Sequence, residues 1–188
     1  EAANIVVTGI SSSFVIMAQT MEPDNFKKII LVNPSDINII KEMPTKETKA
    51  AKTILEIPIL GTFIYNLIMH HKRILNYIES KYIFKKTFLS SKLEDTYFES
   101  AHKGNSAGKY LLASTKGNYV NIDITNAVKK ADNLYIISSR ERNNAVAITE
   151  KYLHLNKNIE ATYISNSRYL PQRETPDKFK DIVLMFLQ

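Results

Sequence analysis

The stretch NIVVTGISSSF, residues 4–14, decides the fold class of this 188-residue chain. It begins with a β-branched run that ends at Gly9, which is typical of a fully buried parallel strand. Three serines follow the glycine, and residues 14–21 have helical character that ends before Pro23. The stretch therefore predicts a strand, a sharp turn and a short helix.

The same pattern returns further along the chain. Buried strands are predicted at 27–34, 133–139 and 161–165, and helices at 144–155 and 175–187. Strands joined by helices in this way form right-handed crossovers in a parallel sheet. The sequence therefore predicts an α/β fold, with a parallel sheet flanked by helices.

The middle of the chain differs in character, because it is rich in Lys, Tyr and Leu and has no strand of comparable quality. Its helices are expected at 45–54, 60–80, 91–103 and 106–116. We therefore expect a core formed by residues 1–36 and 123–188, with a helical cap inserted at 37–122.

The amino-acid composition of the chain excludes several kinds of site and disfavours nucleic-acid binding. The net charge is +6 and the pI about 9.3, but 25 basic residues are interleaved with 19 acidic ones, which favours a solvated surface over nucleic-acid binding. The absence of cysteine excludes disulfides, thiolate metal sites and a cysteine nucleophile, and the four histidines show no metal-ligand spacing. We expect no metal and no organic cofactor, and a cytoplasmic location.

The most apolar segment, residues 57–69, is shorter than the roughly 20 residues of a membrane span. It is expected to form a buried or lipid-facing helix. Because the chain begins at Glu1 with no signal-peptide pattern, we expect it to be part of a longer protein.

Ligands of parallel sheets gather where the strands end, and the segments found there resemble a known family. TGISSSF resembles the nucleophile elbow of the α/β-hydrolases, G-x-S-x-G, with Gly9 and Ser11 at the first glycine and the serine and Ser13 at the second glycine. KIILVNPS resembles the strand after the elbow in that family, and SNSRYLPQRETPDKF resembles its last turn. Between them, IPILGTFIYNLI and YFESAHKGNSAGKYLLAS resemble segments of its cap. The resemblance covers nearly the whole chain and implies the C-terminal portion of an α/β-hydrolase-like fold, truncated at its N-terminus.

The resemblance implies acyl transfer with Ser11 as the nucleophile and the amide of Ser12 as an oxyanion donor. Arg142 stands where the family has its acid, so Glu141 or Asp36 would have to substitute, and Tyr169 stands where the family has its histidine. The implied function is a serine esterase or lipase-like carboxylic ester hydrolase, acting on a small apolar or acyl ester ligand. The alternatives are a catalytically inactive pseudo-hydrolase that binds a ligand or partner, and peripheral binding to an anionic surface through the basic cap.

Several of these residues also have simpler interpretations. The serines could cap the helix, because their hydroxyls accept the free amides of its first turn. Glu141 could form a surface ion pair with its arginine neighbours, and Tyr169 could close the pocket with its ring. His102 could reach a pocket or simply pack, whereas His70 and His71 are expected to end an apolar helix and interact with its carbonyl end.

Overall fold

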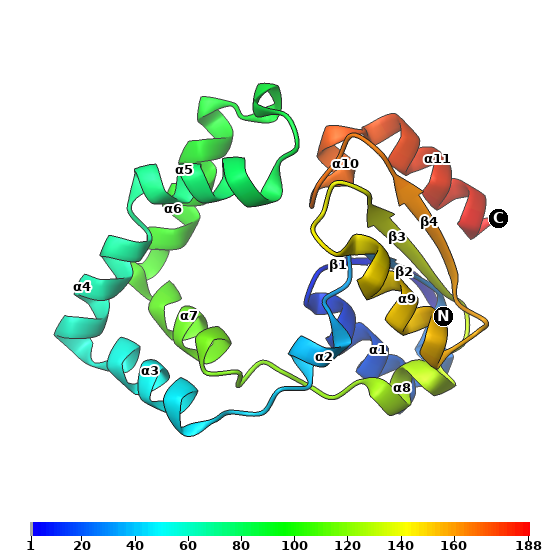
Figure 1. The fold of residues 1–188 in the computed structure, drawn as a ribbon, viewed down its shortest axis with the longest axis horizontal. Coiled ribbons are helices and arrows are strands. Elements are labelled where there is room, and N and C mark those ends of the chain that lie inside the picture. The colour runs from blue at the N-terminus through cyan, green and yellow to red at the C-terminus, as the bar shows by residue number, and fades with distance from the viewer. Residues whose placement is uncertain (1) are drawn as a thin grey trace. The chain divides into compact units, whose positions relative to one another are not determined.

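The computed structural model describes residues 2–188 and contains four strands with helices between them (Figure 1). The elements, in chain order, are β1 (Ala3–Thr8), α1 (Ser11–Met21), η1 (Pro23–Asn25), β2 (Phe26–Val32), α2 (Ile37–Ile40), α3 (Lys46–Glu56), α4 (Pro58–Ile68), α5 (His71–Tyr77), η2 (Ile78–Tyr82), η3 (Lys86–Phe88), α6 (Ser91–Ser106), α7 (Gly108–Lys116), α8 (Thr125–Lys130), β3 (Leu134–Ser139), α9 (Ala145–Leu155), β4 (Glu160–Ile164), α10 (Pro171–Glu174) and α11 (Pro176–Leu187).

The four strands form one parallel sheet in the order β1-β2-β3-β4. The registers pair Val32 of β2 with Thr8 of β1 and with Ile137 of β3, so the carboxyl ends of these strands meet at one edge. All four predicted strands are confirmed to within two residues at their starts and their ends, but the full burial expected for the first is wrong, because β1 lies at the edge of the sheet and its residues are exposed or half-buried. The expectation of an α/β fold with a parallel sheet flanked by helices is therefore confirmed.

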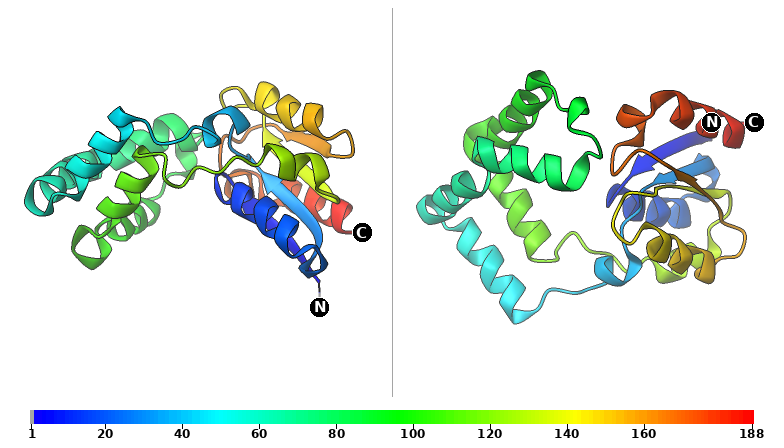
Figure 2. Two further views of the ribbon diagram at one scale, coloured as in Figure 1. Left: turned by 90° about the horizontal axis from the view of Figure 1, so that it is seen from below. Right: turned by 45° about the horizontal axis from the view of Figure 1, so that its top comes forward.

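Apolar side chains cover both faces of the sheet, which is why its central strands read as continuous apolar runs. Ile29 and Leu31 of β2 face α1, α8 and α9, whereas Ile30 and Val32 face α11. The right-hand view of Figure 2 shows α11 above the strands and α1 and α9 below them. The fold thus holds the loops after the strands on a rigid, three-layered support.

The chain divides into two compact units, one of residues up to Lys41 and from Ile122 to Gln188, the other Glu42–Asn121. The first is the sheet with its helices, which we call the core unit. The second is entirely helical and is called the helical unit. Its first boundary falls five residues after the 36/37 boundary expected from the sequence, because the short helix α2 packs its Ile37 and Ile40 into the core unit.

The prediction of one long helix at 60–80 is wrong, because α4 and α5 are separate helices. His70 has an extended backbone, with φ −63° and ψ 140°, and precedes the first residue of α5, His71. The two histidines therefore begin α5 and do not end α4. The imidazole of His71 instead packs against Phe98, with ring centroids 5.3 Å apart.

Within the described residues 2–188, no single helix has both the length and the apolar composition needed to cross a membrane. Only α3 and α4 taken together pass such a test, and they are bent by 99° relative to each other.

Candidate functional site

The turn between β1 and α1 is built around Gly9, which has a positive φ of 58°. Its amide donates to the carbonyl of Val32 on β2, at 3.0 Å, so the turn is fixed to the end of the neighbouring strand. Glycine adopts this conformation at little steric cost. Ser11 follows as the first residue of α1 and is exposed, and the residue with positive φ lies two positions before it.

The serines do not cap α1. Ile10 occupies the N-cap position without a side-chain hydrogen bond, and the Ser13 hydroxyl donates to the Ile10 carbonyl at 2.6 Å. The buried Ser12 hydroxyl has no hydrogen-bond partner within residues 2–188, and the Ser12 amide donates to Gly9 O at 3.2 Å. The simple capping interpretation is therefore wrong, and the Ser12 amide is occupied inside the turn.

A buried polar network joins the loops that follow β2, β3 and β4. Asn33, directly after β2, accepts a bond from the Ser139 amide at 2.8 Å and donates to the Ser139 hydroxyl at 3.0 Å. The same amide group lies 3.3 Å from the Tyr169 carbonyl, and the Ser139 hydroxyl is 2.7 Å from that of Ser167. Hydrogen bonds between buried polar groups thus connect these segments at the carboxyl edge.

Arg142 and Tyr169, which stand at the acid and histidine positions of the resemblance, are brought together. The guanidinium carbon of Arg142 lies 5.0 Å from the centre of the Tyr169 ring, within the range of a cation–π interaction. Arg142 is buried and donates to the Pro34 carbonyl at 2.8 Å, whereas its Nε has no hydrogen-bond partner within residues 2–188. The two residues that the resemblance puts at the acid and histidine positions are thus a cation and a phenol ring in contact.

The two substitute carboxylates are engaged elsewhere. Glu141 accepts the amides of Asn166 and Ser167, at 2.8 and 3.3 Å, and so holds the loop after β4. It forms no ion pair within residues 2–188, so the surface ion pair expected for it is wrong.

Asp36 caps α2 through the Asn38 amide, at 2.9 Å, and binds the ammonium of Lys151 through both oxygens, at 2.8 and 2.7 Å. Burial raises the pKa of this carboxyl, but the bonds from Lys151 and Asn38 and the charges of Lys151 and Arg142 outweigh burial, so the pKa is lowered. Asp36 is thus an ionised structural carboxylate that fixes the loop after β2.

The core unit has one histidine, His154. It lies in the last turn of α9, whose first residue follows the carboxyl end of β3. A helix that connects two parallel strands runs back from the carboxyl edge of the sheet to the other edge. His154, near the end of α9, therefore lies towards the edge opposite to the carboxyl edge. No histidine of the core unit is therefore at the carboxyl edge.

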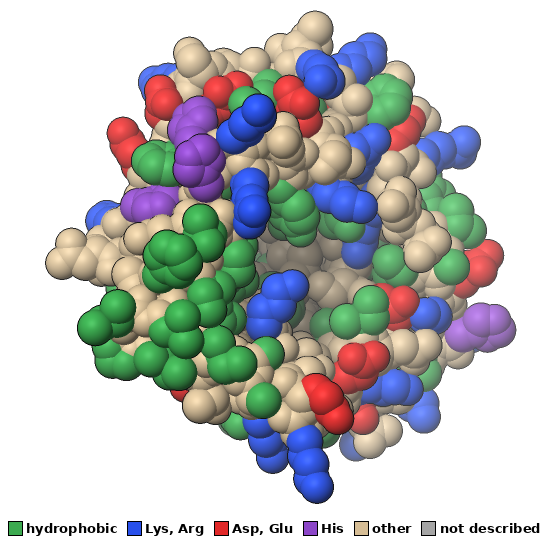
Figure 3. All heavy atoms as spheres, turned by 60° about the vertical axis from the view of Figure 1, so that its left-hand side comes forward, with side chains coloured by type: hydrophobic (Ala, Val, Ile, Leu, Met, Phe, Trp, Pro, Cys, Tyr) green, Lys and Arg blue, Asp and Glu red, His purple; other side chains and the backbone are tan. Residues whose placement is uncertain are grey.

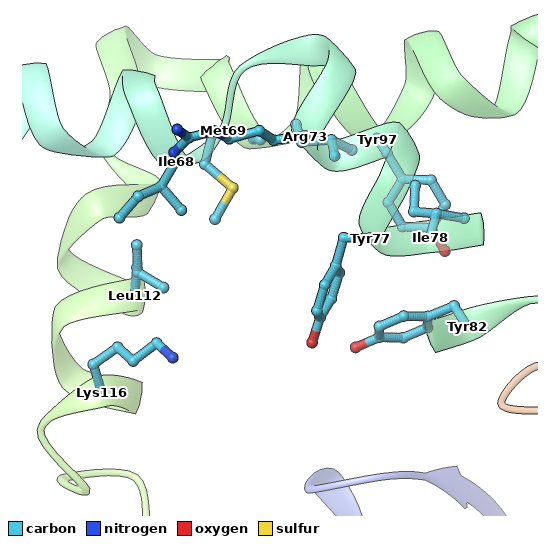
Figure 4. Close-up of a pocket in the computed structure, with 11 residues that line it drawn as sticks. Ile68, Met69, Arg73, Tyr77, Ile78, Tyr82, Tyr97, Leu112 and Lys116 are labelled. Atoms are coloured by element: carbon cyan, nitrogen blue, oxygen red, sulfur yellow. The ribbon is translucent and has the colours of Figure 1, made fainter. Parts of the chain in front are cut away.

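The helical unit contains a cavity of about 500 Å³ (Figure 4). Its lining is aliphatic and aromatic, with Tyr77, Tyr82 and Tyr97 among its residues, and none of the lining residues is acidic. Two cations, Arg73 and Lys116, also line it. Cavities of this size and composition are typical of sites for small molecules.

The close-up shows how these side chains are disposed. The Lys116 amino group and the Tyr82 hydroxyl point into the space from opposite sides, and Leu112 and Met69 contribute apolar walls (Figure 4). Neither Arg73 nor Lys116 forms an ion pair with any of residues 2–188. The arrangement suits an apolar molecule that carries an anionic group.

His102 does not line this cavity. Its Nδ1 lies 2.9 Å from the Phe98 carbonyl, and its ring packs on that of Phe98 with centroids 4.3 Å apart. Of the two roles considered for His102, packing is therefore the one that the structure shows. Among residues 2–188 no group of three or more His, Cys, Asp or Glu side chains could hold a metal ion.

Two functional features were missed from the sequence alone. The signal for Asn33 was its place before Pro34 at the end of a buried strand, which is a turn pattern but does not reveal bonds to residues 106 and 136 positions away. The cavity had only a diffuse signal, the concentration of tyrosines in the middle of the chain.

Solved structures share this fold at low sequence identity. The alpha/beta hydrolase MGS-M2, from a Medee basin deep-sea metagenome library, is 18% identical, with a TM-score of 0.64 over 99% of this chain and 65% of its own. The meta-cleavage product hydrolase CumD of Pseudomonas fluorescens IP01 is 13% identical, with a TM-score of 0.71 over 100% of this chain and 65% of its own. A serine hydrolase from Cycloclasticus zankles is 14% identical, with a TM-score of 0.69 over 100% and 64%.

No family model matches the chain, and no curated protein sequence is significantly similar to it. The chain spans 64% to 65% of the length of the three solved proteins described above. Because all three are matched along nearly the whole of this chain, it has the α/β-hydrolase fold, as the resemblance implied.

Proposed function

We propose that this chain is part of a pseudo-hydrolase, a protein of α/β-hydrolase fold that binds a small acyl or aromatic ligand and does not hydrolyse it through a serine triad. The observation that carries the proposal is the contact between Arg142 and Tyr169. A general base must accept a proton near neutral pH, which a neutral phenol does poorly and a guanidinium does not do at all.

The surroundings of this contact support the same conclusion. Glu141 and Asp36 hold backbone amides and Lys151 with their oxygens, and neither bonds to a histidine within residues 2–188. The one histidine of the core unit lies away from the carboxyl edge. We therefore infer that Ser11 lacks a base among the described residues of the core unit.

The cavity of the helical unit supports the ligand class. Aliphatic and tyrosine side chains would enclose an acyl chain or aromatic ring, and the ammonium of Lys116 would pair with a carboxylate. We infer that the ligand is a monocarboxylate with an apolar body.

A fluorophosphonate probe tests the absence of hydrolysis. The native chain is expected to be labelled no faster than the Ser11→Ala variant, because a serine hydroxyl without a base remains protonated and unreactive. Labelling is followed by intact-protein mass spectrometry, with an active serine hydrolase in the same reaction to show that the probe is competent. Labelling of the native chain that disappears in Ser11→Ala and persists in Ser13→Ala would overturn the proposal.

Ligand binding is tested separately by calorimetry with decanoate and decanol. Decanoate is expected to bind more tightly than decanol. Lys116→Glu is expected to weaken the binding of decanoate by at least tenfold, since a hydrogen bond between charged groups contributes roughly 1.5–3 kcal/mol. The affinity for decanol is expected to change less than twofold in this variant.

The matched control for this charge reversal is Lys92→Glu, at an exposed lysine of α6 that does not line the cavity. It is expected to leave both affinities unchanged. Equal affinities of the native chain for decanoate and decanol, or equal effects of the two substitutions, would contradict the assignment of Lys116.

A second candidate function is acyl ester hydrolysis by Ser11. The observation in its favour is that Ser11 is an exposed residue in the first turn of α1, directly after the Gly9 turn. Its base would have to come from outside the core unit. The labelling experiment decides between the two functions, because only hydrolysis requires a reactive Ser11.

A further inference from the structure

The helix α4 has an unusual surface. It contains no charged residue, and helices that are apolar on all sides are normally buried. Yet Ile59 is 87% exposed and Phe63 60%, and Leu60 and Leu67 are exposed as well. We call these four residues the apolar face of α4.

The apolar face is a continuous stripe that faces away from the unit. Positions 59, 63 and 67 follow one another at intervals of four and therefore share one side of the helix. The opposite side is fixed by Tyr65, which is buried and donates to the Ala101 carbonyl at 2.6 Å. Gly61 packs so closely on the end of α3 that an added Cβ would clash with the Leu55 carbonyl. The exposed stripe is thus a consequence of firm packing on the other side.

The charge of the chain is concentrated in the same unit. Residues 42–121 contain twelve Lys and Arg against seven Asp and Glu, a net charge of +5 out of +6 for the whole chain. Exposed lysines flank α4 in the sequence, with Lys46 and Lys49 on α3 before it and Lys72 on α5 after it. None of these three forms an ion pair with any of residues 2–188.

Figure 3 shows this combination on one side of the molecule. Hydrophobic side chains gather into a patch on the side that carries α3 and α4 in Figure 1, next to histidines and with Lys and Arg side chains around it. Helices that lie in a membrane interface combine an apolar face with basic residues, and here the basic residues come from the neighbouring helices α3 and α5 because α4 has none. Anionic lipids attract such basic residues by about 1 kcal/mol each.

We propose that the helical unit docks on an anionic lipid bilayer through the apolar face of α4. At about 1.5 Å per residue, the 11 residues of α4 are too short to cross the roughly 30 Å hydrocarbon core, so the helix would lie in the plane of the interface. The basic residues favour a lipid surface over an apolar protein partner, because they supply charge complementarity that such a partner would not need. The inference does not depend on the proposed function, since it uses neither the carboxyl edge nor the cavity.

The test is co-sedimentation of the full chain with phosphatidylcholine vesicles, with and without phosphatidylserine. Binding is expected to require phosphatidylserine and to fall steeply as salt is raised, because salt screens the attraction. The double variant Phe63→Ser/Leu67→Ser is expected to bind at least tenfold more weakly, since it removes two exposed side chains that would enter the interface.

The matched control is Met185→Ser on α11, a residue that is also 60% exposed but lies in the core unit. It is expected to change binding less than twofold, and circular dichroism should show that both variants keep their helices. Three outcomes would each overturn the proposal: no vesicle binding at low salt, equal binding by the native chain and the double variant, or a dimer of the native chain that the double variant abolishes.

Discussion

Replacing Asn33 with alanine is expected to lower the free energy of unfolding by about 3–4 kcal/mol, the largest effect that we expect for a polar substitution at the carboxyl edge. Asn33 is buried and both ends of its amide are used, so alanine leaves the Ser139 amide without a partner in a dry environment. Its φ of 48° adds a second cost, since alanine is strained in the left-handed region. Urea unfolding followed by circular dichroism measures the change.

A second asparagine separates the two contributions. Asn166 also has a positive φ, 64°, but is exposed, and its side chain forms no hydrogen bond within residues 2–188. Asn166→Ala is therefore expected to cost only the backbone strain, about 1 kcal/mol. Equal losses in the two variants would mean that the buried network of Asn33 does not stabilise the fold.

The bonds of Asn33 also illustrate which features of the structure could be predicted from the sequence and which could not. All four strands could be predicted, because each is a short run rich in β-branched or aromatic residues, which is a property of the run itself. Their burial could not, because β1 reads like the buried strands β2 and β3 but has no buried residue. The network of Asn33 could not, because its partners come from loops more than a hundred residues away. The break between α4 and α5 was missed for the same kind of reason. His70 turns the chain within a stretch whose local composition favours helix, and packing such as that of His71 on Phe98 is not visible locally.

The candidate site was partly predictable. The resemblance placed Arg142 and Tyr169 at two positions that should meet, and the structure brings their side chains together. It also offered Glu141 and Asp36 as acids, but each binds backbone amides whose directions depend on the conformation of particular turns. Turn conformation of this kind is set by tertiary contacts, so the identity of a carboxylate in the sequence did not reveal its partner.

Tyr152→Ala is the hydrophobic substitution from which we expect the largest effect, a loss of about 3–5 kcal/mol in the free energy of unfolding. Tyr152 on α9 has no exposed surface and packs in the cluster that joins α9 to the sheet and to α2. Its hydroxyl donates to the Ser35 carbonyl at 2.9 Å, so it also fixes the loop that carries Asp36. Alanine would leave a cavity at this junction, and the loss is read from urea unfolding.

Tyr152→Phe is the control that keeps the ring and removes only the hydrogen bond, at an expected cost of about 1 kcal/mol. The pair of variants also predicts a pH effect. Burial raises the pKa of the Tyr152 hydroxyl, Arg142 lowers it and Asp36 raises it further, and the net result lies well above the usual value of about 10. The hydroxyl therefore ionises in the unfolded chain first, so its contribution is complete below pH 10 and is lost as the pH rises further. The native chain should lose stability above pH 10 more steeply than Tyr152→Phe, and parallel curves for the two proteins would contradict the buried, protonated hydroxyl.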